Sequence, residues 1–348
     1  MATTDRFGNA LAMAREFMEN GLCAGFAMAD ADNGPVLCDG LQCFEEKRLP
    51  MTPRSRFDIA SVGKTMTAML AAQLVAEGRI DPDAPFTDYL PEHVLARENC
   101  GITIRDLATH SSGFDNSTPY QKATSQGEFL HLLFAKRPVR QRGVAFEYAC
   151  SNLIYIGKII ERLTGLDLDA AARQRLWEPL GMKNSSWYPI KDDGNVVEFP
   201  EPPGRRIGDH NDPSCHRSEL PLGSGSLFTT IGDMRLFLAD MLHRRRFPKE
   251  CYDLLFTECF NGQNVRGDHV RRTFGWDMVS TGSDSGTYPG MGFSDAAIAH
   301  TGWTGMTVVV DPKTDFLGAF LSNRLGSYPR YQEAKDGRAR ILAALARH

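Results

Sequence analysis

The stretch FDIASVGKTMTAML, residues 57–70, contains two overlapping patterns that could do chemistry. Its Gly-Lys-Thr is similar to the end of a phosphate-binding loop, whereas Ser61 and Lys64 form a Ser-x-x-Lys that could pair a nucleophile with its own base. A phosphate-binding loop requires a glycine five residues before its Gly-Lys-Thr, so that backbone amides can curl around the phosphates. Asp58 occupies that position, and its carboxylate would repel the ligand. The sequence therefore favours the Ser-x-x-Lys pair over a nucleotide site.

The residues around this pair predict the element that holds it. RFDIA indicates a short extended segment, and the apolar spacing that follows indicates a long helix beginning at Ser61. Residues at i and i+3 share a helix face, and a helix N-terminus offers partial positive charge and a free N–H to a developing oxyanion. About one Ser-x-x-Lys is expected by chance in a chain of this length, so the motif alone is also compatible with a helix N-cap beside a solvated lysine.

The two ends of the chain carry the strand patterns. Each end combines a helical pattern with two strand-like runs around a turn, and one antiparallel sheet with the terminal helices on a face would bury all of these apolar runs. The N-terminal set is a helix at 10–19 and the strands CAGFAMAD and GPVLCDGL around Asp32-Asn33-Gly34; the C-terminal set is MTVVVD and DFLGAFLSN around Pro312-Lys313-Thr314, and the helix YQEAKDGRARILAALARH.

Helical patterns dominate the centre of the chain. We therefore predict an α+β fold, with a discontinuous sheet domain from residues 1–64 and 241–348, a mostly helical domain from 65–240, and the active site between them. Residues 191–221 are rich in Pro, Gly, Asp and Asn and should form a long surface loop near the cleft. The helical runs are TMTAMLAAQLVAEG, TIRDLATH, EFLHLLFA, SNLIYIGKIIERLTG, DLDAAARQRLW and TIGDMRLFLADMLH.

Composition limits the classes of function. The 348 residues include 39 basic and 43 acidic side chains, a net charge of -4 without a long run of either sign, which argues against a nucleic-acid partner. Neither a signal peptide nor a membrane-spanning run is apparent, so a cytoplasmic protein without a membrane partner is predicted. The eight cysteines lack a Cys-x-x-Cys pair and are expected to be free thiols. His210, Cys215 and His216 match no standard metal-site spacing, so neither a metal nor a cofactor is predicted.

Five ordered blocks carry a resemblance to a known family. They are FDIASVGKTMTAMLAAQLVAEGRIDPDAPFTDYLPE, TIRDLATHSSGF, EPLGMKNSSWYP, GSGSLFTTIGDMRLF and HTGWTGMTVVVDP. On these blocks the chain resembles the serine β-lactamase and penicillin-binding-protein superfamily, in the branch that holds class C β-lactamases, family VIII esterases and D-aminopeptidase or DD-peptidase relatives. The similarity extends from about Gly21 to Tyr328 and implies a fold of a sheet domain and a helical domain with the site between them.

The second catalytic element of that family, Tyr-x-Asn, is similar to FEYACSNLIYIGKIIE. Aligned without a gap, Tyr148 takes the tyrosine position and Cys150 takes the asparagine position. The resemblance implies that the asparagine bonds the lysine and often the amide carbonyl of the substrate, and a thiol is a weak partner for either. Asn152, two residues further on, is the alternative partner if the loop is shaped differently.

The third element, Lys-Thr-Gly in β-lactamases, matches His300-Thr301-Gly302. The resemblance implies that the backbone N–H of Trp303, which follows Gly302, supplies the second oxyanion donor beside that of Ser61. Histidine here removes a fixed cation that could hold a substrate carboxylate, and a histidine can be uncharged near neutral pH.

What the resemblance implies about chemistry is acylation of Ser61 followed by hydrolysis, with Lys64 and Tyr148 sharing the proton transfers and His300 lining the site. Burial could lower the pKa of Lys64 by about three units, or Lys64 could stay charged and hold Tyr148 as a phenolate. The sequence leaves both alternatives open.

We therefore predict a serine hydrolase whose partner is a small-molecule ester or amide, most simply a carboxylesterase with weak β-lactamase activity. Cys150 and His300 favour the ester, because each replaces a group with which the family handles amide substrates. The alternatives are a β-lactamase, a D-aminopeptidase-like or DD-peptidase-like amidase, an acyltransferase, and a penicillin-recognising protein that binds a ligand without turnover. The oligomeric state is left unknown.

Overall fold

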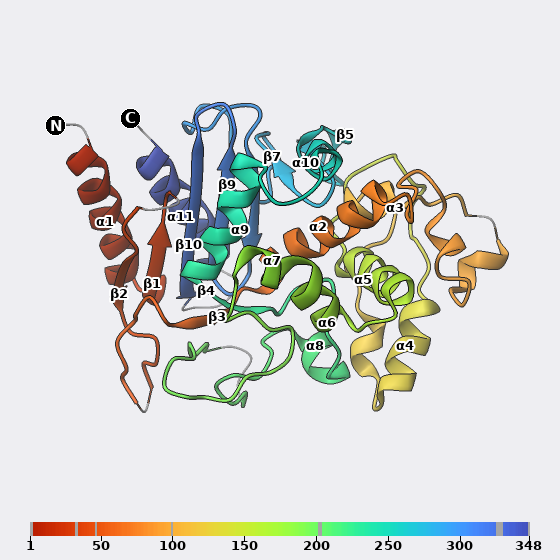
Figure 1. Ribbon diagram of the computed structural model, residues 1–348, viewed down its shortest axis with the longest axis horizontal. Coiled ribbons are helices and arrows are strands. Elements are labelled where there is room, and N and C mark those ends of the chain that lie inside the picture. Colours follow the sequence, from red (N-terminus) through yellow and green to blue (C-terminus); the bar gives the residue numbers. More distant parts are fainter. Residues whose placement is uncertain are drawn as a thin grey trace.

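The computed structural model describes residues 3–31, 34–45, 47–98, 100–200, 204–324 and 330–346, and these contain an eight-stranded antiparallel sheet (Figure 1). Its strand order is β2-β1-β10-β9-β8-β7-β6-β5. The strands are β1 (Cys23–Ala29), β2 (Leu37–Gly40), β5 (Phe260–Gln263), β6 (His269–Arg272), β7 (Asp277–Met278), β8 (Ile298–Gly302), β9 (Met306–Asp311) and β10 (Phe316–Arg324). Two further strands, β3 (Arg56–Asp58) and β4 (Phe228–Thr230), pair with each other in a separate small sheet.

Helices cover both faces of the central strands. α1 (Thr3–Glu19) and α11 (Tyr331–Ala346) lie side by side on one face, and α9 (Ile231–His243) packs on the other (Figure 1). Side chains of successive β1 residues point to opposite faces of the sheet. Phe26 stacks on Phe320 on the face covered by α1, whereas Ala27 packs in the core on the face covered by α9. Burial on both faces explains why β1, β9 and β10 are almost continuous apolar runs.

The remaining helices form a second region beside the sheet (Figure 1). At its centre lies α2, in which every residue from Gly63 to Leu74 is buried, as expected for a helix that is apolar on most sides. It packs against α5 and α10, and its N-terminal end adjoins the sheet. These helices are α2 (Gly63–Ala76), α3 (Ile104–Ala108), α4 (Gln126–Phe134), α5 (Cys150–Thr164), α6 (Leu168–Ala172), α7 (Glu178–Leu180), α8 (Pro213–Ser218) and α10 (Lys249–Phe256), with the short turns η1 (Ala60–Val62), η2 (Phe86–Asp88), η3 (Val94–Arg97), η4 (Pro119–Lys122) and the π-helical η5 (Arg173–Trp177).

The predicted fold class, the terminal helices and the four predicted strands, which are β2, β1, β10 and β9 at one side of the sheet, are confirmed. The strands β5, β6 and β7 have no predicted counterpart, because they are short and carry no apolar run. Asp32 and Asn33, in the predicted turn between β1 and β2, lie outside the described residues. Within the predicted loop at 191–221, the structure adds the short helix α8. The division at residue 240 stays a prediction. That residue lies within α9, which packs on the sheet, whereas the following α10 packs on α2 in the helical region.

Candidate active site

Ser61 lies in a tight turn rather than at the first residue of a long helix. It occupies the middle of the 3₁₀ turn η1, and α2 begins two residues later at Gly63. Ala60, directly before the serine, has a φ of 46°, a left-handed conformation that costs energy for a residue with a Cβ. Ser61 is partly exposed, while the residues on both sides of it are buried. The turn therefore presents one hydroxyl at the surface of an otherwise closed core.

Two of the predicted residues, Lys64 and Tyr148, contact the hydroxyl of Ser61. The Nζ of Lys64 lies 3.0 Å from the Oγ of Ser61, and the phenol of Tyr148 donates to the same oxygen over 2.8 Å. Lys64 also donates to the backbone carbonyl of Ser224 and lies 3.7 Å from the Sγ of Cys150. The Nζ is 5.0 Å from the centre of the Tyr148 ring. The serine hydroxyl thus has an amine and a phenol in direct contact, which is the arrangement that proton transfer to or from it requires.

The charge state of the pair follows from burial and from its neighbours. Burial favours the neutral amine of Lys64, whereas the negative charge that Cys150 and Tyr148 carry once ionised raises its pKa, and the net direction is above the ordinary lysine value. Burial raises the pKa of Tyr148 to about 12, against the opposite effect of the Lys64 ammonium. Near neutral pH the resting pair is therefore an ammonium and a neutral phenol. Of the two alternatives left open by the sequence, the raised pKa of Lys64 favours a lysine that stays charged, and the raised pKa of Tyr148 argues against a resting phenolate; which group is the main base stays a prediction.

His110, a residue that the sequence analysis did not predict at the site, packs against Tyr148. The two rings stack with centres 4.6 Å apart, and the Nδ1 of His110 accepts the backbone N–H of Ala149 over 3.2 Å. Burial, with the charges of Arg272 and Lys64, lowers the pKa of His110 far below its usual value, so the ring is neutral. It lies in the block TIRDLATHSSGF, whose match to the family was the only available signal.

Cys150, not Asn152, is the residue beside Lys64. Asn152 is fully buried; its Oδ1 accepts from the hydroxyl of Ser112 over 2.8 Å, and its Nδ2 lies 3.1 Å from the Nδ1 of His110. The structure therefore corrects the alternative in which Asn152 replaces the missing asparagine. Burial raises the pKa of Cys150, so its side chain is a neutral thiol. A second unforeseen residue is Asn116, whose Oδ1 accepts the backbone N–H of Cys150 over 3.1 Å.

The third motif, His300-Thr301-Gly302, lies on β8 and packs against η1, the turn that carries Ser61 (the nucleophile turn). A Cβ on Gly302 would stand 2.4 Å from the carbonyl oxygen of Ile59, so only glycine permits this approach. Thr304, just after Trp303, donates its hydroxyl to the carbonyl of Asp58 over 2.9 Å. These contacts bring the Trp303 backbone to the residues that precede Ser61, which fits its expected place at an oxyanion hole.

His300 lies on the same strand, and its ring is neutral. Its Nδ1 donates to the carbonyl of Thr301 over 2.9 Å, and its Nε2 is buried without a hydrogen-bond partner. Burial lowers its pKa to about 3, helped by the charges of Arg272 and Lys64. Among the described residues, no hydrogen bond joins His300 to Ser61, Lys64 or Tyr148, so its predicted participation remains a prediction.

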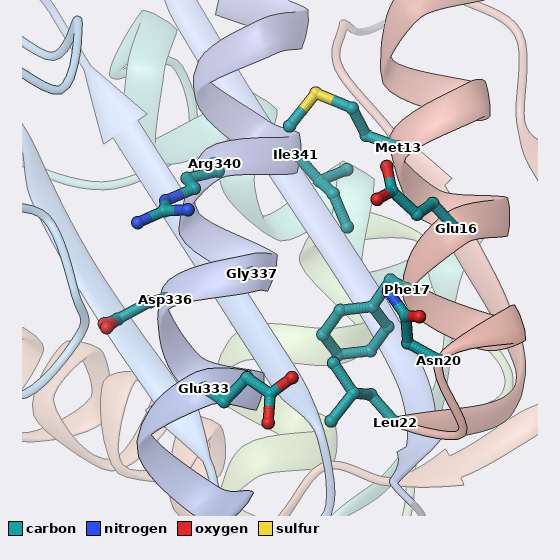
Figure 2. A pocket seen from close by; sticks show the side chains of 10 residues that line it. All are labelled: Met13, Glu16, Phe17, Asn20, Leu22, Glu333, Asp336, Gly337, Arg340 and Ile341. Atoms are coloured by element: carbon teal, nitrogen blue, oxygen red, sulfur yellow. The ribbon is translucent and has the colours of Figure 1, made fainter.

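Other predicted features lie outside this site. The described part of the chain holds no group of three or more His, Cys, Asp and Glu side chains placed to bind a metal, and the Nε2 of His210 contacts the carbonyl of Trp187 at 2.9 Å instead. All eight cysteines are free thiols. No helix in the described residues is both long and apolar enough to cross a bilayer. A groove of about 350 Å³ lies between α1 and α11, and Figure 2 shows Met13 and Phe17 of α1 facing Ile341 of α11 across it; Ser61 is not among its lining residues.

Comparison with known proteins places this geometry in a family. A family model described as Beta-lactamase matches residues 11–343. The chain is 26% identical over 308 residues to the N-acetylmuramyl-L-alanine amidase of Bacillus subtilis (strain 168), which covers 79% of this chain and 69% of that protein. It is 24% identical over 318 residues to a putative D-alanyl-D-alanine carboxypeptidase of Escherichia coli (strain K12), with 80% and 71% covered.

A solved structure agrees over the whole chain. EstCE1, described as a hydrolase with promiscuous acyltransferase activity, superposes with a TM-score of 0.79 at 18% identity and covers 99% of both chains. The protein therefore belongs to the Beta-lactamase family and is a serine hydrolase of the β-lactamase and penicillin-binding-protein superfamily. The predicted resemblance is confirmed.

Proposed function

We propose that the protein is a carboxylesterase that forms an acyl-enzyme on Ser61, with weak activity on β-lactams. The single observation that supports this most strongly is the contact of the Ser61 hydroxyl with both Lys64 and Tyr148, at 3.0 and 2.8 Å. A hydroxyl becomes a nucleophile when an adjacent group removes its proton, and the two contacts offer two such groups.

Acylation proceeds from the form of the Lys64–Tyr148 pair that has lost one proton. The Oγ of Ser61 attacks the ester carbonyl while its proton passes to the pair, and the oxyanion is held by the backbone N–H groups of Ser61 and Trp303. The pair then gives the proton to the leaving alcohol, whose bond to the acyl carbon breaks. Water then attacks the acyl carbon of the acyl-enzyme, and its proton passes through the pair to the Oγ of Ser61. The bond between Ser61 and the acyl carbon breaks, and the acid is released. His300 lines the site as a neutral ring.

Two substitutions support an ester over an amide. The Cys150 thiol provides only a weak hydrogen bond where the family has an amide, and neutral His300 cannot offer a fixed charge to a carboxylate. Esters have the better leaving group and depend less on such contacts. The small-molecule partner is accordingly an ester without an essential carboxylate.

The test compares a short-chain nitrophenyl ester with a chromogenic cephalosporin, using the wild-type protein and the Cys150→Asn variant. We expect kcat/KM for the wild type to be higher on the ester, and we expect Cys150→Asn to raise the cephalosporin value about tenfold by restoring one hydrogen bond to the substrate. Faster turnover of the cephalosporin by the wild type would instead support the amide-directed alternative.

That alternative has independent support, because the curated relatives are named as an amidase and a putative carboxypeptidase. Acyl transfer to an alcohol is the second alternative, supported by the activity in the description of EstCE1, and it shares the same first step. Product analysis with added alcohol separates transfer from hydrolysis. Covalent labelling of Ser61 by a fluorescent penicillin without later release would favour ligand binding without turnover.

A further inference from the structure

Asp58 is a buried carboxylate with an unusually complete set of donors. It ends β3 and is 0% exposed. Its Oδ1 accepts the backbone N–H of Ala60 over 2.9 Å, and its Oδ2 accepts the backbone N–H and the Nδ2 of Asn211 over 2.8 and 3.0 Å. Oδ2 also accepts the hydroxyl of Ser226 over 3.1 Å. All four contacts are donors, which an ionised carboxylate satisfies and a neutral amide does not.

Two of the four contacts lead to residues whose backbone is strained. Ala60 precedes the nucleophile and has a φ of 46°, and Ser226 has a φ of 54°. Ser226 lies two residues after Ser224, whose carbonyl accepts from the amine of Lys64. Non-glycine residues in this region of backbone space cost of order 1–3 kcal/mol, so the surrounding contacts must hold them. Asp58 bonds both strained residues at once.

The two strained turns also touch each other and the third motif. A Cβ on Gly225 would stand 2.4 Å from the carbonyl oxygen of Ala60, so the turn at 224–226 lies directly against the nucleophile turn. The backbone carbonyl of Asp58 accepts the hydroxyl of Thr304, next to Trp303. One residue thus contacts the turn that carries the nucleophile, the turn that fixes the lysine and the strand end that carries the oxyanion donor.

We propose that Asp58 is a positioning residue that sets the distance between the Ser61 hydroxyl and the Lys64 amine by holding the two turns together. The proposal rests on the proposed function, because it assigns Asp58 to the same acylation step. Asp58 touches neither the substrate nor the reacting atoms; it acts through Ala60 and Ser226. In Asp58→Asn, one oxygen becomes an NH₂ that faces a donor, so one of the two turns is released.

The experiment compares Asp58→Asn with a matched control, Asp240→Asn. Asp240 is also a buried carboxylate, bonded to the phenol of Tyr252 over 2.7 Å and to the backbone N–H of Arg246 over 2.9 Å, at the end of α9. The melting temperatures of the two variants should fall by similar amounts. Only Asp58→Asn should lower kcat for a nitrophenyl ester, and the rate of Ser61 labelling by a fluorophosphonate, by about 10²-fold with little change in KM, because small misplacements of reacting groups have effects of that size.

The outcomes separate the positioning role from the proposed function. If Ser61→Ala retains full esterase activity, the proposed function fails. If Ser61→Ala is inactive but Asp58→Asn keeps the wild-type kcat and labelling rate, only the positioning role is overturned. If Asp58→Asn does not fold, Ser226→Ala serves as the test, because it removes one hydrogen-bond donor and leaves the carboxylate in place. We expect this variant to lose kcat several-fold at unchanged KM. An unchanged kcat would overturn the proposal.

Discussion

The two faces of the sheet are built on different principles. Beneath α1 and α11, apolar side chains such as Phe17, Phe26 and Phe320 pack in favourable contact geometry. On the side of α2, the core also holds Lys64 and His300, and the Nε2 of His300 has no hydrogen-bond partner. Buried charge is not confined to this side, because Arg338 of α11 is fully buried as well, but here the buried polar groups surround the partly exposed Ser61.

Part of the backbone strain is also found at the site. Of the seven described non-glycine residues with positive φ, three adjoin the Ser61 site, namely Ala60, His110 and Ser226, and the other four lie elsewhere in the chain. Such conformations persist only where surrounding contacts enforce them, and here Asp58 and the packed glycines do so. The difference predicts that substitutions at the two faces will separate activity from stability.

The largest expected effect is on the reactive face. Ser61→Ala should lower kcat for a nitrophenyl ester by at least about 10⁴-fold, because the covalent step is lost, while leaving the melting temperature unchanged or raised. Steady-state kinetics and thermal unfolding measure the two quantities. A purified Ser61→Ala protein with wild-type turnover would show that the serine does not carry the reaction.

The opposite result is expected beneath α1. Phe320→Ala removes a ring that packs against Phe17 and Phe26 at centre distances of 5.8 and 5.5 Å. The free energy of unfolding should fall by about 3–5 kcal/mol. Urea unfolding gives the stability, and kcat per labelled Ser61 gives the activity, which we expect to stay within about twofold because the two faces act independently. A large loss of kcat in the folded fraction would show that the faces are coupled.

The third prediction concerns pH. The pKa of Lys64 is raised and that of Tyr148 is raised to about 12, so the reactive form of the pair, which lacks one proton, becomes more populated as pH rises. The value of kcat/KM should therefore increase by up to about tenfold per pH unit from about pH 6 to pH 9, without reaching a plateau. Phe320→Ala, whose site is intact, should give the same profile. A plateau already reached below about pH 7 would instead indicate a lysine whose pKa burial has lowered.

Much of the architecture could be predicted locally. Strands β1, β9 and β10 are apolar runs bounded by turn residues, and α5 has clear helical periodicity, so these patterns are visible in the chain itself. β5 to β7 could not be predicted in this way, because their pairing comes from neighbours in space and not from their own composition. The first residue of α2 was also misplaced, since the turn η1 depends on Asp58 and on the close approach of Gly225.

The sequence by itself indicated the type of chemistry, because one helical turn brings Ser61 and Lys64 together and because five ordered blocks resemble those of a serine hydrolase family. The gap-free alignment of FEYACSN predicted Tyr148 as a partner of the serine, and the block HTGWTGMTVVVDP predicted His300 at the site. Only the tertiary structure decided that Cys150 rather than Asn152 lies beside the lysine, that His110 supports the tyrosine and that Asp58 joins the turns. These pairs are far apart along the chain, and the direction of each side chain depends on packing and buried hydrogen bonds that form only when the whole core has closed.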